Sequence, residues 1–165
     1  MSEPSAVLRF GDINPAELTA LLASFQLEVC VTGEDEEIPG SYWGDEEAGL
    51  IKGRLYLRAD TPVHSVLHEA CHYICMDRER RDALDTNAGA DDDEENAVCY
   101  LQLLLARNLS SISDERLFSD MDAWGYSFRL GSTQAWFEQD ADDARSWLLK
   151  NGLIDSNNQP EWRLR

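Results

Sequence analysis

The fold is decided by the stretch Val66-Leu67-His68-Glu69-Ala70-Cys71-His72-Tyr73-Ile74. Apolar residues lie on both sides of the two histidines, and Thr61-Pro62 supplies a capping residue and a proline for a first helical turn. We therefore expect a helix from Pro62 to about Arg80. Positions four apart lie on one face of a helix, so His68 and His72 would present two imidazoles side by side.

Two imidazoles at this spacing can both reach one zinc ion at about 2.0–2.1 Å. Glu69 directly follows the first histidine. Its carboxylate can hold a water molecule that zinc activates, and it can accept the proton of that water during attack on a carbonyl. The motif therefore predicts one zinc ion bound by His68 and His72, with Glu69 as the general base.

His64 extends the histidine series by one more turn. Each turn rises about 5.4 Å, so a straight helix separates His64 from His72 by roughly 12 Å, too far to share one tetrahedral ion. We expect His64 to have a structural role or to orient a ligand, without binding the metal itself.

A third ligand has to come from elsewhere in the chain. The acidic run 91–95 precedes a helix expected from about Asp91 to Asn108, and most of the run suits the helix dipole. The apolar residues of this helix form a stripe on one face, and positions three, four and seven residues before them coincide at Glu94. Glu95 instead aligns with Gln102 and is expected to face solvent. The stripe comprises Ala97, Val98, Leu101, Leu104 and Leu105. A carboxylate on an inward stripe is costly unless it is paired or binds a metal. Glu94 is therefore the predicted third ligand.

The remaining pattern predicts a mixture of short strands and helices. A β-prone run covers 27–32, and residues 49–58 alternate with period two, as a half-buried strand does. Asn14-Pro15 indicates the start of a first helix, and helical spacing returns near 117–124 and 137–148. We expect one α+β domain over residues 1–165, with the motif in about 49–106 and a helical C-terminal part over about 110–152.

Composition and charge narrow the class of protein. The chain has 165 residues, 43% of them hydrophobic, which suits a single globular core. Its net charge of −18 repels nucleic-acid backbones and anionic lipid, so neither is an expected partner. No apolar run is long enough to span a membrane, and the N-terminus does not resemble a secretion signal. Cys71 and Cys75 lack the context of a disulfide framework, and a cytoplasmic location is expected.

The motif resembles that of gluzincin metallopeptidases, in which His-Glu-x-x-His is followed by a glutamate on a second helix. Within the zincins the chain is most similar to the small ImmA/IrrE-type peptidases, over about Gly49 to Ala106. That family has a Glu-x-x-Ala pattern with paired leucines on the second helix, matched here by Glu94, Ala97, Leu104 and Leu105. Many of its members have proline soon after the leucine pair, where this chain has Ala106.

The resemblance implies a zincin-like fold, in which a small mixed or antiparallel sheet packs on the motif helix. It implies His68, His72 and Glu94 as zinc ligands and Glu69 as the general base. It also implies a strand over 51–57 as the sheet edge along which a peptide substrate pairs. We expect zinc-dependent hydrolysis of a peptide or protein substrate. The alternative is a catalytically silent zinc-binding regulatory or interaction protein, which a closed four-ligand site would favour.

Overall fold

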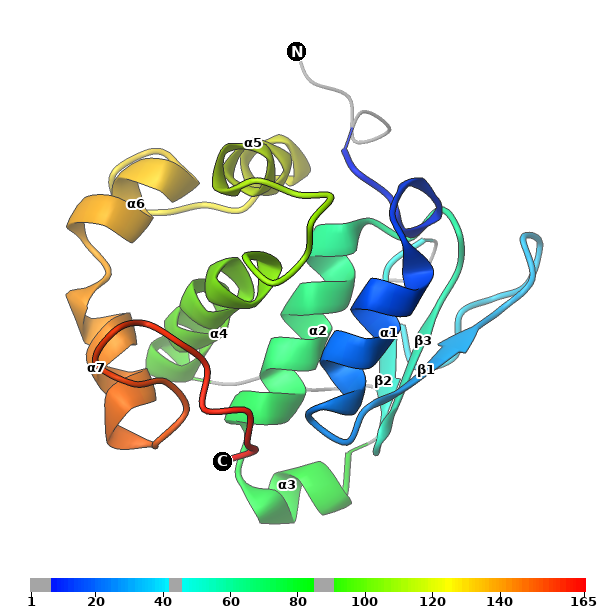
Figure 1. Cartoon of the computed structure of the whole chain (residues 1–165), viewed down its shortest axis with the longest axis horizontal. Helices are drawn as coiled ribbons and strands as arrows, with labels where there is room; N and C mark the ends of the chain where they lie inside the picture. Colours follow the sequence, from blue (N-terminus) through cyan, green and yellow to red (C-terminus); the bar gives the residue numbers. More distant parts are fainter. Residues whose placement is uncertain (1–6, 42–45, 85–90) are drawn as a thin grey trace.

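The computed structural model describes residues 7–41, 46–84 and 91–165. Residues 1–6, 42–45 and 85–90, the last of them between the two helices expected at 62–80 and 91–108, lie outside the described residues. The described chain forms a small mixed sheet and seven α-helices (Figure 1), so the α+β class is confirmed. Its elements are the short 3-10 helix Phe10–Asp12, α1 (Pro15–Ala23), β1 (Glu28–Val31), β2 (Gly49–Ile51), β3 (Arg54–Leu57), α2 (Val63–Cys75), α3 (Arg78–Asp82), α4 (Asp92–Ala106), α5 (Asp114–Trp124), α6 (Thr133–Gln139) and α7 (Asp142–Lys150).

The sheet has the order β1-β3-β2, with β1 parallel and β2 antiparallel to β3. The single strand expected over 49–58 is in fact two strands, because the chain reverses at Lys52-Gly53. Lys52 adopts the positive φ of 52° that such a tight turn requires. β3 is the central strand and pairs on both sides. The prediction that a strand over 51–57 forms a free edge for a peptide is therefore wrong for β3. Only its first residue, Ile51, belongs to the edge strand β2.

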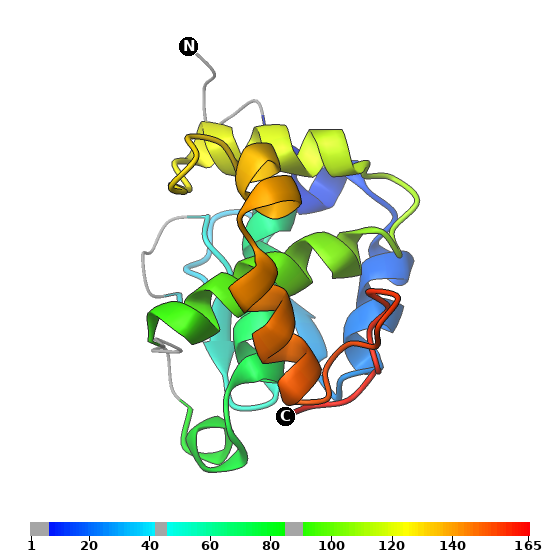
Figure 2. The same ribbon diagram turned by 90° about the vertical axis from the view of Figure 1, so that its left-hand side faces the viewer.

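The helices gather on one side of the sheet (Figure 1). α1 contacts β1, and α2 contacts both β2 and β3. α4 packs against the side of α2 away from the sheet, and α7 packs on α4 (Figures 1 and 2). The motif helix α2 is therefore enclosed between the sheet and α4, and eleven of its thirteen residues are buried.

The motif helix is shorter than expected and ends at Cys75. Asp77 then caps the separate short helix α3, its side chain accepting a hydrogen bond from the Arg80 amide at 2.9 Å. The buried Arg81 donates to the carbonyl oxygens of Tyr73 and Met76, which satisfies backbone acceptors at the end of α2. At the other end Thr61 is not the capping residue, because its hydroxyl accepts from the Arg58 amide.

Helix α4 is the central helix of the fold. Every residue from Ala97 to Ala106 is buried, so the helix has no solvent-facing side over this length. Among the described residues, no helix has both the length and the apolar character that crossing a bilayer requires. All four cysteines are free, and Cys71, Cys75 and Cys99 are buried in the core, as expected for Cys71 and Cys75.

Candidate metal centre

His68, His72 and Glu95 bring three potential ligand atoms together between α2 and α4. His68 Nε2 lies 3.0 Å from Glu95 Oε1, His72 Nε2 lies 3.2 Å from Glu95 Oε2, and the two Nε2 atoms are 3.2 Å apart. A tetrahedral zinc ion about 2.05 Å from each of its ligands holds them about 3.3 Å apart. The histidine nitrogens contact different oxygens of the Glu95 carboxylate, and one ligand atom from each residue lies within 4.8 Å of the others, a spacing that can hold one small divalent cation.

The Glu95 side chain is in the form that metal binding requires. Burial raises the pKa of the Glu95 carboxyl, but the hydrogen bonds and charges of His68 and His72 outweigh burial and hold that pKa well below its usual range. Glu95 is therefore a carboxylate, the ionised form that acts as a ligand. Two imidazole nitrogens and one carboxylate oxygen make up the donor set of His₂Glu zinc sites.

The prediction that Glu94 lies beside the histidines is wrong. Its carboxylate turns to the other side of α4, where Arg80 binds both of its oxygens at 2.9 and 2.7 Å. Arg165, near the end of α7 in space, adds a third contact at 3.2 Å. Glu94 is indeed buried, as the stripe argument required, but arginine charges compensate its burial in place of a metal.

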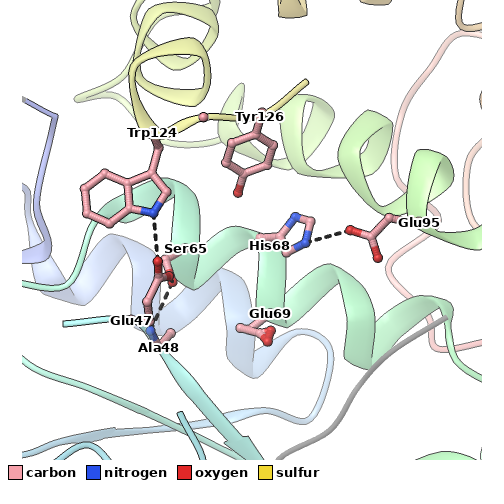
Figure 3. Close-up of a pocket in the computed structure, with 9 residues that line it drawn as sticks. Glu47, Ala48, Ser65, His68, Glu69, Glu95, Trp124 and Tyr126 are labelled. Carbon is pink, nitrogen blue, oxygen red and sulfur yellow. Dashed lines mark hydrogen bonds and ion pairs between the residues drawn. The ribbon is translucent and has the colours of Figure 1, made fainter. Parts of the chain in front are cut away.

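The cluster forms part of the wall of a pocket of about 380 Å³ (Figure 3). His68, Glu69 and Glu95 line the pocket, while His72 lies behind them and is buried. Glu95 keeps 41% of its side-chain surface exposed, so the metal position faces the pocket. Three protein ligands and one open side are the arrangement of a catalytic zinc site, whereas a structural site is closed by four.

Glu69 projects from α2 into the same pocket (Figure 3). Its Oε2 atom is buried and has no hydrogen-bond partner among the described residues. Burial raises the pKa of the Glu69 carboxyl, and the nearby His72 and His68 offset this only in part. An unpartnered carboxylate with a raised pKa is suited to accept a proton from a water molecule near neutral pH.

The opposite wall of the pocket contains Tyr126. Gly125 ends α5 in the left-handed conformation, with φ of 107°, and the amide of Tyr126 bonds back to the Met121 carbonyl at 3.1 Å. This turn carries the tyrosine ring over His68, with the ring centroids 5.5 Å apart. Tyr126 therefore lines the pocket with its hydroxyl-bearing ring, whereas Tyr100 packs against Trp136 and Phe137.

His64 lies outside the metal-binding group, as its helical position predicts. It is buried against Trp124 and Tyr126, and its Nδ1 is 3.2 Å from the Tyr126 hydroxyl. Burial lowers the pKa of His64 to about 3, with the nearby His68 and Arg9 adding to the effect. His64 is therefore a neutral imidazole at physiological pH.

Glu47 is a third carboxylate in the lining of the pocket. The Trp124 indole donates to its Oε1 at 2.7 Å, and the Ser65 hydroxyl donates to its Oε2 at 2.8 Å. Ser65 also accepts from the amide of Ala48, which ties the chain entering β2 to the first turn of α2. The contacts of Glu47 come from neutral donors, so they position the carboxylate without neutralising its charge.

Comparison of the chain with protein-family models, with curated protein sequences and with solved structures finds no match. The roles of the site residues therefore follow from their chemistry and geometry.

Two neighbouring glutamates of α4 provide a direct test of this geometry. Loss of an outer hydrogen-bond partner of a metal ligand costs about 10- to 100-fold in metal affinity. We expect Glu95→Ala, which removes a proposed ligand, to weaken zinc binding by more than that. Glu94→Ala should leave zinc binding nearly unchanged and instead lower the free energy of unfolding by about 1–3 kcal/mol, because it removes the buried carboxylate partner of two partly exposed arginines. Competition with a chromogenic chelator and urea unfolding measure the two effects. The reverse pattern would show that α4 presents Glu94 to the metal.

Proposed function

We propose that this chain is a zinc-dependent peptidase of the zincin type, with zinc held by His68, His72 and Glu95. One observation carries the proposal. His68, His72 and Glu95 each place a ligand atom within 4.8 Å of the others beside an open pocket, next to Glu69, whose carboxylate has a buried oxygen without a partner among the described residues. A metal site with only a structural role has no use for that carboxylate.

The chemistry is divided between the metal and the chain. When bound, zinc lowers the pKa of a coordinated water toward about 7 and polarises a carbonyl oxygen. The chain supplies the base, since Glu69 accepts a proton in the pocket and can return it to the departing amine. His68 and His72 hold their nitrogens toward the metal position, and Glu95 contributes a negative charge from α4.

The gluzincin resemblance supports this assignment with one change of residue. The family pattern requires a glutamate from a second helix, and Glu95 takes the place that the motif comparison gave to Glu94. A strand directly before the motif helix, and a second helix that carries a glutamate, are also what the resemblance implies. The zincin-like fold is therefore part of the proposal.

The pocket favours peptides that carry positive charge. Its described lining includes three carboxylates, Glu47, Glu69 and Glu95, and no lysine or arginine. The net charge of −18 produces a field of the same sign around the whole chain. We therefore propose peptide segments containing lysine or arginine near the scissile bond as the preferred substrates.

Metal removal tests the proposed activity. Zinc-loaded protein is expected to cleave members of a mixed peptide library, and dialysis against a chelator should abolish cleavage. Readdition of one equivalent of zinc should restore it, because the proposed site holds a single ion. Mass spectrometry of the digests identifies the cleaved bonds and the residues around them.

Two results would contradict the proposal. Cleavage that survives complete removal of the metal would show that the activity does not depend on this centre. Absence of cleavage by protein with zinc demonstrably bound would favour the alternative, a zinc-binding regulatory or interaction protein.

A further inference from the structure

Gln102 on α4 connects three groups around the metal centre, and it is fully buried. Its Nε2 donates to the backbone carbonyl of His64 at 2.8 Å and to the Tyr126 hydroxyl oxygen at 3.3 Å. Its Oε1 lies 3.0 Å from Nδ1 of His68. Gln102 therefore joins α2, α4 and the segment after α5 at one point.

The hydrogen-bond pattern determines which way the amide faces. A backbone carbonyl can only accept, so the amide group that faces His64 O has to be the NH₂. The amide oxygen then faces the ring of His68, and an oxygen can only accept. Nδ1 of His68 must therefore carry the hydrogen, which leaves the lone pair for the metal on Nε2. This is the same nitrogen that lies 3.0 Å from Glu95.

The same reasoning determines which groups donate and accept hydrogen bonds at the Tyr126 hydroxyl. Because Gln102 Nε2 donates to the Tyr126 oxygen, the phenolic hydrogen is left for Nδ1 of the neutral His64. Burial raises the pKa of Tyr126, which keeps that hydrogen in place. Both amide hydrogens of Gln102 and the hydroxyl hydrogen of Tyr126 thus have an acceptor, and the orientation of Gln102 is supported from both sides.

We propose that Gln102 is a positioning residue that holds His68 in the tautomer and ring orientation needed for metal binding. This inference rests on the proposed metal centre and is independent of whether a peptide is the substrate. The second histidine differs, because Nδ1 of His72 is buried with no hydrogen-bond partner among the described residues. Beyond its contacts within the cluster, His72 therefore has no outer hydrogen bond among the described residues, and Gln102 supplies the outer hydrogen bond of the centre through His68.

A neutral amide has a further consequence in this position. Ligand histidines often donate to a carboxylate, whose charge raises the basicity of the ring. Gln102 gives the same orientation without adding charge to a pocket that already contains three carboxylates. A carboxylate at position 102 would also face the carbonyl oxygen of His64 without a hydrogen to donate.

The test compares Gln102→Met with Leu103→Met, a neighbouring core substitution on the same helix that leaves the network intact. Gln102→Met should bind zinc about 10- to 100-fold more weakly than wild type in competition with a chromogenic chelator. Leu103→Met should remain within about two-fold, because a volume-conserving apolar exchange is well tolerated. Thermal unfolding of both metal-free variants shows whether their folds are equally intact.

A second measurement uses the unaltered chain. In zinc-loaded wild type, long-range ¹⁵N–¹H spectra of the histidine rings should show a slowly exchanging hydrogen on Nδ1 of His68. Loss of this signal in Gln102→Met would support the proposal. A wild-type spectrum with Nδ1 bound to metal, or zinc affinity unchanged in Gln102→Met, would overturn it. Failure of wild type to bind zinc at all would refute the metal centre itself.

Discussion

Protein carrying His72→Ala is expected to lose its zinc. Two of the three short distances in the cluster involve His72 Nε2, and this side chain is the most buried of the three ligands. Loss of an outer hydrogen-bond partner already costs about 10- to 100-fold in metal affinity, so removal of a ligand should cost more. Elemental analysis after gel filtration should fall from near one zinc per chain to a small fraction. His68→Ala should behave in the same way.

The third histidine provides the matched control. His64 lies one turn earlier on α2, and its side chain is also buried, but it lies outside the metal-binding group. Its bond to Gln102 uses the backbone carbonyl, which His64→Ala retains. This variant should therefore keep near-equimolar zinc. Equal loss of zinc from the His64 and His72 variants would point to disruption of α2 and away from ligation.

Glu69→Gln is expected to separate metal binding from catalysis. The amide keeps the shape of the side chain but cannot accept a proton from water. Because general base catalysis contributes roughly 10²- to 10⁴-fold, kcat/KM for a cleaved peptide should fall by that factor. Zinc content should stay near one per chain, since Glu69 is not among the three proposed ligands.

The control for this substitution is Glu138→Gln, which makes the same chemical change at an exposed position on α6. Its kcat/KM should match wild type. Equal rates for Glu69→Gln and wild type would remove Glu69 from the mechanism, whereas loss of zinc from Glu69→Gln would indicate that the carboxylate is a ligand.

The motif helix could be read from the sequence because its signals are local. Histidine spacing, apolar flanks and a proline before the first turn are all properties of adjacent residues. The helix end was less predictable. Residues 76–80 are compatible with a continuing helix, and the break at Asp77 depends on Arg81 binding the carbonyls of Tyr73 and Met76.

The predicted third ligand, Glu94, and the carboxylate that lies beside the histidines, Glu95, differ by one residue for a physical reason. An apolar stripe identifies the inward face of a helix only when the other face meets solvent. Helix α4 is buried on all sides from Ala97 to Ala106, so its apolar residues do not mark a single inward face, and Glu94 contacts arginines while Glu95 contacts histidines. A local signal did exist. Glu95 and Gln102 are seven apart, hence on one face, and Gln102 is the only strongly polar residue in the apolar run 97–106.

The partners of Glu94 and Gln102 come from distant parts of the chain. Arg165 reaches Glu94 across 71 positions, and Tyr126 and His64 meet Gln102 from different elements. Such contacts depend on how the helices pack, which residue spacing does not specify. Sequence reasoning therefore selected two histidines that the structure brings together and a glutamate in the same pocket, while packing determined which carboxylate joins the histidines and which amide contacts His68.

A crystal structure of the chain with zinc bound, phased with anomalous data collected on either side of the zinc absorption edge, tests the central claim most directly. We expect one anomalous peak between α2 and α4, about 2.0–2.2 Å from Nε2 of His68, Nε2 of His72 and one carboxylate oxygen of Glu95, with its remaining side open to the pocket. A peak coordinated by Glu94, or one closed by a fourth protein ligand, would contradict this account.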